Sequence, residues 1–257
     1  MNNIIAIIAI LVATAFLTSC STGSGNGSSG KNIIVLVDIS KSIKPAVLDW
    51  YIQTIEKDIC ANLSQFDKIK ILPIDGASQT ASMSLLDLDL FEHRSEWNVI
   101  GLNANETDKL KKLAFAQFLH SKMQELRTAI AKAQDYRKIV GNTTDILGGI
   151  ESAQDKFDRD YNNTIVILSD MEQYGESLKM RSKNQASQWL AQTADVKFAN
   201  ISKFSIMIIT GEQMAMPKPY YNEIKMYWNE FLTNQGVKSI NYQGADASQL
   251  KQYLANN

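Results

Sequence analysis

The sequence is poor in several residue types on which common protein classes depend. Its 257 residues include two cysteines, two histidines and four prolines. Such a chain cannot be a disulfide-stapled mini-protein, and it has too few soft ligands for a Cys/His zinc site. Four prolines and 9% aromatic residues exclude collagen-like and disordered chains. What remains is a globular protein of ordinary composition that is long enough to bury a core.

An excess of charge of one sign is also absent. The 26 basic residues nearly balance the 27 acidic ones, and the formal net charge is −1. A chain with this balance creates no overall field that would attract nucleic acid, so we expect no nucleic-acid partner. The function must therefore lie in local groups of residues.

An almost unbroken apolar run extends from Ile4 to Leu17. It is too short for a confident transmembrane helix and has the length of the hydrophobic region of a secretory signal. We predict a signal peptide at 1–19, a Ser/Gly-rich tether at 20–30 and one folded domain at 31–257. A short membrane anchor that is never cleaved is the alternative.

The run ends in Leu17-Thr18-Ser19-Cys20, which resembles the lipobox of bacterial lipoproteins. In that family the signal is cut before the cysteine, whose sulfur and new amino group are then acylated. The resemblance implies a protein of the bacterial cell envelope that is anchored by lipid at Cys20. Ser21 after the cysteine resembles the pattern of lipoproteins sorted to the outer membrane, where the organism has two membranes.

Behind the tether, apolar β-branched runs alternate with helical patterns. Strands are expected at 32–37, 68–74, 83–91, 164–168, 204–209 and 238–242. Helices are expected at 45–63, 107–137, 145–157, 185–194, 220–233 and 247–254. The link to the third strand is too short for a parallel crossover, so this edge strand should be antiparallel. The fold class is therefore α/β: a three-layer, Rossmann-like doubly wound sandwich with a mostly parallel six-stranded sheet.

Acidic residues stand where two of these strands stop. The first strand runs into Asp38, and the fourth runs into Asp170. In a doubly wound sheet of order 3-2-1-4-5-6, strands 1 and 4 are neighbours, so both carboxylates should face the same crevice. Carboxylates held close together repel each other unless a cation lies between them. Mg²⁺ (or Mn²⁺) prefers oxygen ligands and would meet this need.

Hydroxyl groups beside the carboxylates would supply neutral oxygen ligands. Alternate residues of a turn can point to one side, which places the Ser40 and Ser42 hydroxyls beside Asp38. A third hydroxyl is available from Thr143 or Thr144, where a helix starts before the fourth strand. Any one of these loops alone could instead be a helix cap. Together they predict a cation site that is close to neutral and has one coordination position open.

The three loops together resemble the von Willebrand factor A (VWA) domain. Its metal-ion-dependent adhesion site (MIDAS) consists of an Asp-x-Ser-x-Ser loop, a Thr loop and an Asp loop, in that order. The resemblance implies coordination of Mg²⁺ or Mn²⁺, in part through water, by five residues of this chain: Asp38, Ser40, Ser42, Thr144 and Asp170.

Two details of the resemblance concern individual positions. Thr144 is preferred over Thr143 because the family's Thr commonly precedes a helix of the form Asp/Asn-Ile-x-x-Gly/Ala. Many bacterial members have Thr-Asp-Gly after the fourth strand, whereas Met171 follows Asp170 here. The usual turn glycine is missing, which leaves the shape of the third loop open.

The resemblance implies a binding module and not an enzyme. The bound metal would grip an acidic group on a protein partner, and no catalytic residue is expected. One alternative is a structural envelope-assembly lipoprotein in which the metal has no role. A more remote one is a Mg²⁺-dependent phosphoryl hydrolase. Against it, Asp38-x-Ser40 stands where aspartyl phosphatases have Asp-x-Asp, and a Gly-rich phosphate loop with its Lys is not found.

Overall fold

The computed structural model describes residues 30–76, 84–98, 104–140, 143–175, 177–181, 184–211, 216–244 and 247–256. The predicted signal peptide, Cys20 and the tether up to residue 29 lie outside the described residues. None of the helices in the described ranges is long and apolar enough to cross a membrane.

One six-stranded sheet forms the centre of the molecule, in the order β3-β2-β1-β4-β5-β6. Its strands are β1 (Lys31–Asp38), β2 (Lys68–Ile74), β3 (Leu86–Asp89), β4 (Asn162–Leu168), β5 (Ser205–Ile209) and β6 (Ser239–Gln243). All neighbours pair in parallel except β3, which pairs antiparallel with β2. The predicted order, the doubly wound topology and the antiparallel edge strand are therefore confirmed.

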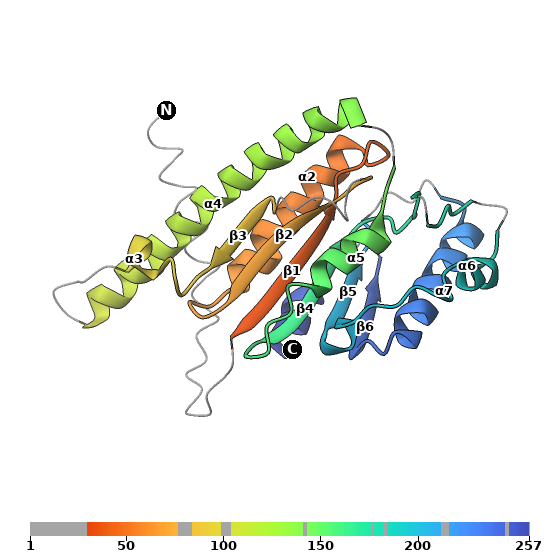
Figure 1. Ribbon diagram of the computed structural model, residues 1–257. Coiled ribbons are helices and arrows are strands. Elements are labelled where there is room, and N and C mark those ends of the chain that lie inside the picture. Colours follow the sequence, from red (N-terminus) through yellow and green to blue (C-terminus); the bar gives the residue numbers. More distant parts are fainter. Residues whose placement is uncertain are drawn as a thin grey trace.

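Helices cover both faces of the sheet, which gives the three predicted layers (Figure 1). One layer contains α2 (Pro45–Thr54), α4 (Ala104–Val140) and α8 (Leu250–Asn256). The other contains α5 (Ile146–Gln154), α6 (Ala186–Gln192) and α7 (Lys218–Asn234). A further short helix, α3 (Arg94–Trp97), precedes α4.

The central strand β1 explains why both faces need a cover. Its odd-numbered residues Ile33, Val35 and Val37 pack into the core on the α2 and α4 side. Ile34 and Leu36 pack into the core on the α5 and α7 side. A strand that is apolar on both faces is stable only when both are shielded from water.

One predicted helix and one predicted strand differ in detail from the structure. The expected helix at 45–63 is α-helical only to Thr54 and continues as a π-helix at Ile55–Ile59 and a 3₁₀-helix at Cys60–Asn62. The expected strand at 83–91 is shortened to the four residues of β3. In contrast, the expected helix at 107–137 is one unbroken helix of 37 residues, α4.

Candidate metal centre

The loops expected to form the metal site meet at the carboxyl edge of the sheet. Val37 of β1 is paired with Leu168 of β4, so Asp38 and Ser169 leave the sheet on neighbouring strands. The start of α5 is fixed to the same edge, because Asp145 donates its backbone N–H to the carbonyl of Asp75 just beyond β2, at 3.0 Å. The sheet thus brings three distant segments of chain together.

The first loop holds a fully buried carboxylate. Asp38 is 0% exposed, and its Oδ1 accepts the backbone N–H of Ser40 at 2.9 Å. The hydroxyls of Ser40 and Ser42 are hydrogen-bonded to each other at 2.8 Å. Ser40 is buried and Ser42 is exposed. The three oxygen-bearing side chains of the Asp-x-Ser-x-Ser sequence are therefore gathered in one turn.

The third loop touches the first directly, through a residue that was not expected to take part. The hydroxyl of Ser169 donates to Oδ2 of Asp38 at 2.8 Å. Oγ of Ser169 in turn accepts the backbone N–H of Met171 at 3.0 Å. Ser169 therefore ties the two loops together and orients the Asp38 carboxylate. The only signal in the sequence is a hydroxyl directly before the expected acid.

The turn that lacks the usual glycine is built by Met171 in the left-handed region, with φ of 66°. A side chain costs free energy there, because its Cβ crowds the neighbouring carbonyl. Two contacts hold the conformation: the Met171 side chain is completely buried, and its carbonyl accepts the indole N–H of Trp228 at 2.8 Å. The sharp turn is thus retained without glycine.

Asp170 lies in an environment that disfavours its charged form. Burial, followed by the negative charge of Asp38, raises the pKa of Asp170 from 3.8 to about 7. One hydrogen bond opposes this shift, from the backbone N–H of Glu172 to Oδ1 of Asp170 at 3.0 Å. Within the described residues, no Lys, Arg or His lies at ion-pair distance from Asp170.

The second loop is fixed by its backbone. Thr144 is 5% exposed and exchanges two backbone hydrogen bonds with Tyr174, at 3.0 and 2.8 Å. Tyr174 comes four residues after Asp170, so this pairing holds the Thr loop against the Asp loop. Thr143 is less buried than Thr144. The choice of Thr144 as the ligand remains a prediction.

Gln173 is the second unexpected residue of the site. Its side chain is fully buried, and Oε1 accepts the backbone N–H groups of Ile146 and Leu147 at 2.6 and 3.1 Å. Its Nε2 donates to Oδ1 of Asp145 at 3.0 Å. Oδ1 of Asp145 also caps α5 by accepting from Gly148 at 3.1 Å. One amide group thus joins the third loop to the free N–H groups of α5.

The side chains of the three loops offer ligands that suit a hard divalent cation. These ligands are the oxygen atoms of two carboxylates and several hydroxyls, which Mg²⁺ and Mn²⁺ prefer. No cluster of three or more His, Cys, Asp or Glu that could hold a metal occurs in the described part of the chain. The expected site has only two acids and completes its ligands with hydroxyls, so this finding does not bear on it.

Buried hydroxyls beside the site also lack a protein partner. Among the described residues, Thr210 Oγ1 and Tyr242 Oη make no hydrogen bond. Tyr51 Oη donates to the carbonyl of Thr210 at 3.1 Å. Burial, followed by the charges of Asp38 and Asp170, raises the pKa of Tyr51. Burial is also the main cause of the raised pKa of Tyr242, to which the Asp170 charge adds. Water molecules around a hydrated cation would satisfy such groups.

The chain matches no protein-family model, and no characterised protein is significantly similar to it.

Proposed function

We propose that this protein is a membrane-tethered binding module that uses a divalent cation to grip an acidic group of a protein partner. The cation, Mg²⁺ or Mn²⁺, would be held by the five residues of the three loops: Asp38, Ser40, Ser42, Thr144 and Asp170. The observation that carries the proposal is the direct Ser169–Asp38 hydrogen bond, with Asp170 next in sequence, because it joins the first and third loops.

The electrostatics of the site support a cation as the missing component. Asp38 and Asp170 lie at neighbouring strand ends, and burial, followed by the negative charge of Asp38, raises the pKa of Asp170. A divalent cation would reverse this effect and favour both ionised carboxylates. Since the protein supplies few charges, the bound ion would keep attraction for one further anion, the carboxylate of a partner.

The tether gives the proposal its cellular setting. The lipobox-like sequence ending at Cys20 supports lipid anchoring in the bacterial envelope, with the binding domain beginning at Lys31. The metal would act here as a binding element, with no bond made or broken by the protein. The partner would be a protein that presents an accessible Asp or Glu side chain.

Isothermal titration calorimetry with Mg²⁺ and Mn²⁺ tests the site itself. A soluble version that begins at Ser21 should bind one ion, and Asp38→Asn and Asp170→Asn should each abolish detectable binding. Asp49→Asn is the matched control, because it removes one exposed carboxylate from α2 and should leave the affinity unchanged. Unaltered affinity in the Asp38 and Asp170 variants would refute the proposed site.

The open coordination position can be tested separately with Mn²⁺. Water bound directly to Mn²⁺ enhances the relaxation of solvent protons, so the loaded protein should show high relaxivity. A peptide with one accessible Asp should lower this relaxivity, whereas the same peptide with Asn should not. Partner complexes that survive a chelator would instead favour the structural lipoprotein, and metal-dependent turnover of phosphate esters would favour the hydrolase.

A further inference from the structure

Two exposed phenylalanine rings are stacked at the sheet edge opposite the candidate metal centre. Phe66 is 47% exposed and Phe91 is 53% exposed. Their ring centroids lie 6.1 Å apart, with 24° between the planes. Phe66 precedes β2, and Phe91 follows the antiparallel strand β3, so both lie where β1 begins. Paired rings that remain half in water form an apolar patch suited to a contact.

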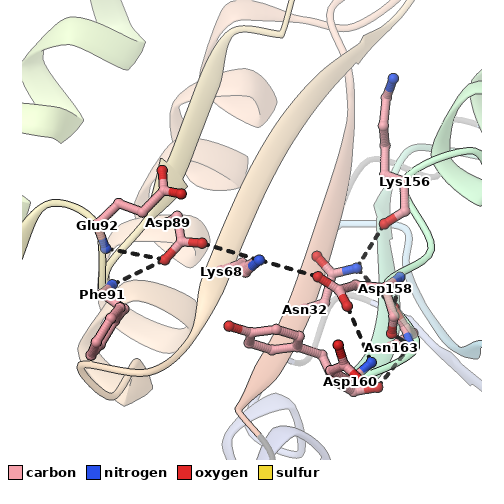
Figure 2. Close-up of polar contacts among 10 residues, drawn as sticks. Asn32, Lys68, Asp89, Phe91, Glu92, Lys156, Asp158, Asp160 and Asn163 are labelled. Carbon is pink, nitrogen blue, oxygen red and sulfur yellow. Dashed lines mark hydrogen bonds and ion pairs between the residues drawn. The ribbon is translucent and has the colours of Figure 1, made fainter.

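The loops that carry the two rings are fastened to each other. Leu90 donates its backbone N–H to the carbonyl of Asp67 at 3.1 Å. Asp89 accepts the backbone N–H groups of Phe91 and Glu92 at 3.1 and 3.3 Å, and it forms an ion pair with Lys68 at 3.0 Å. Figure 2 shows the contacts of Asp89 with Lys68, Phe91 and Glu92, with the Phe91 ring pointing away from them. The pair is therefore held at the edge by the fold.

The chain enters the sheet beside this pair. Gly30 lies so close to the loop with Phe66 that a Cβ at its position would be 2.1 Å from the carbonyl oxygen of Phe66. The next residue, Lys31, donates its backbone N–H to Asp67 at 2.8 Å, and Asp67 follows Phe66 directly. The point from which the predicted tether departs is thus in contact with the loop that carries Phe66.

The length of the tether keeps this edge near its anchor. Ten residues along the chain separate Gly30 from Cys20. In any conformation they span at most about 35 Å. The eight residues of β1 then lead about 26 Å away, to the edge that carries Asp38. Of the two edges, the one with the phenylalanines is therefore the one that the tether holds close to a bilayer.

Charge at this edge does not oppose a lipid surface. Lys68 is neutralised by ion pairs with Asp89 and Asp158, at 3.0 and 3.1 Å. Other charged side chains close to the strand starts and loops at this edge are of both signs, among them Lys31, Lys156, Arg159, Lys203, Lys238, Glu92, Asp155 and Asp160. Without a dominant sign, contact with a bilayer would depend on the apolar rings and would change little with salt.

We infer that the Phe66–Phe91 pair rests in the interface of the bilayer to which Cys20 is anchored, so that the metal-site edge faces away from that bilayer. The inference rests on the lipid anchor of the proposed function and is independent of the metal. A tethered domain needs only a weak second contact, because the tether supplies a high local concentration of lipid surface. Phenylalanine side chains provide such a contact in interfacial proteins.

An environment-sensitive fluorophore tests the orientation on the complete acylated chain. Glu92→Cys carries the fluorophore NBD beside Phe91, and Asp49→Cys carries it near the opposite edge. Both positions are exposed, whereas Cys60 is buried and should not be labelled. The protein is reconstituted into vesicles of phosphatidylethanolamine and phosphatidylglycerol. We expect brighter, blue-shifted emission from position 92, unchanged emission from position 49, and no effect of 1 M salt.

Variants assign the effect to the two rings. Phe66→Ser with Phe91→Ser should abolish the change at position 92, whereas Phe66→Leu with Phe91→Leu should retain it. Circular dichroism checks that both variants are folded, as expected for exposed positions. Anchored protein with unchanged emission at position 92 would overturn the inference and leave the anchor intact.

Other results separate the anchor from the orientation. Protein that fails to sediment with vesicles would overturn the anchor, and the inference with it. A change that disappears when the anchored protein is diluted with excess lipid would assign the rings to a contact between two copies of the chain. A change lost in high salt would assign the contact to charged groups. Each of these three results contradicts the inference.

Discussion

At the scale of single residues, the Asp38 carboxylate is oriented before any cation binds. One of its oxygens accepts a backbone N–H from Ser40, and the other accepts the hydroxyl of Ser169. A ligand that is already held in place loses less conformational entropy when it coordinates a metal. The neighbouring residues Asp170 and Met171 are the ones held in unfavourable states, one electrostatic and one conformational.

Met171 should reverse the usual order of alanine and glycine variants. Both Met171→Ala and Met171→Gly lose the buried side chain and should destabilise the protein by about 2–4 kcal/mol. Alanine keeps the cost of the left-handed conformation, whereas glycine has none, so the glycine variant should be more stable by about 1 kcal/mol. Urea unfolding of the two variants measures the difference. A more stable alanine variant would contradict the assigned φ of 66°.

Asp170 should make the metal-free protein less stable as the pH rises. Its folded-state pKa of about 7 lies above the ordinary value of 3.8, so between these values the folded protein binds the extra proton. The free energy of unfolding should therefore fall from about pH 4 to about pH 7 and then level off.

The Asp170→Asn variant isolates this contribution. In chelator, its free energy of unfolding should lack the fall, so that the difference from the parent protein grows with pH by about 4 kcal/mol at most. Equilibrium urea unfolding at several pH values measures that difference. A pH-independent difference would show that Asp170 ionises normally. With Mg²⁺ present, the parent protein should become more stable than the Asp170→Asn variant, since only the parent protein binds the ion.

At the scale of elements, the N-terminus of α5 is fastened to the loop after β4 by one amide side chain. Gln173 accepts two backbone N–H groups of α5 that have no partner within the helix. It also contacts Asp145, the N-cap residue. The Thr loop and the Asp loop therefore both depend on Gln173, which is not adjacent in sequence to any expected ligand.

Gln173→Ala should weaken metal binding without touching the metal. It leaves two buried N–H groups unsatisfied and should destabilise the protein by about 2–3 kcal/mol. Because it removes the side-chain link between the Asp loop and the start of α5, and leaves only the backbone pairing of Thr144 with Tyr174, Mg²⁺ affinity should fall about 10- to 100-fold.

The control is Gln154→Ala at the other end of α5. Gln154 is also buried and accepts the backbone N–H of Asn200 at 2.7 Å. This variant should lower stability but leave the affinity for Mg²⁺ unchanged in calorimetry. Equal loss of affinity in both variants would mean that the effect of Gln173 is general destabilisation.

At the scale of the whole molecule, the site joins parts of both layers to the sheet. The first loop leads from β1 to α2 in one layer, and the other two loops adjoin α5 and α7 in the opposite layer. A cation bound to all three loops would be lost on unfolding, so its binding free energy adds to the stability of the fold.

Thermal unfolding should therefore depend on Mg²⁺ concentration. At 100 times the dissociation constant, the gain is about 2.7 kcal/mol. For a domain of this size, it corresponds to a rise in Tm of roughly 5–10 °C. A chelator of Mg²⁺ should reverse the rise in Tm, whereas removal of Ca²⁺ alone should not. The Asp38→Asn variant should show no rise in Tm with Mg²⁺. A Tm that stays constant across Mg²⁺ concentrations would contradict binding to the folded state.

The α/β fold can be predicted from the sequence alone, because the pattern of apolar residues indicates which strands are buried on both faces and which strand lies at an edge. The sequence also predicted that Asp38 and Asp170 lie at neighbouring strand ends, since the carboxyl ends of adjacent parallel strands must meet; that they bind a metal stays a prediction. The roles of Ser169, Gln173 and Met171 become apparent only when the chain is folded. Ser169 and Gln173 form hydrogen bonds with residues far away in the sequence. Met171 takes the place of the usual glycine because its buried side chain holds the turn. No local sequence pattern encodes either feature. The same is true of Phe66 and Phe91, which become a pair only where β2 and β3 are packed side by side.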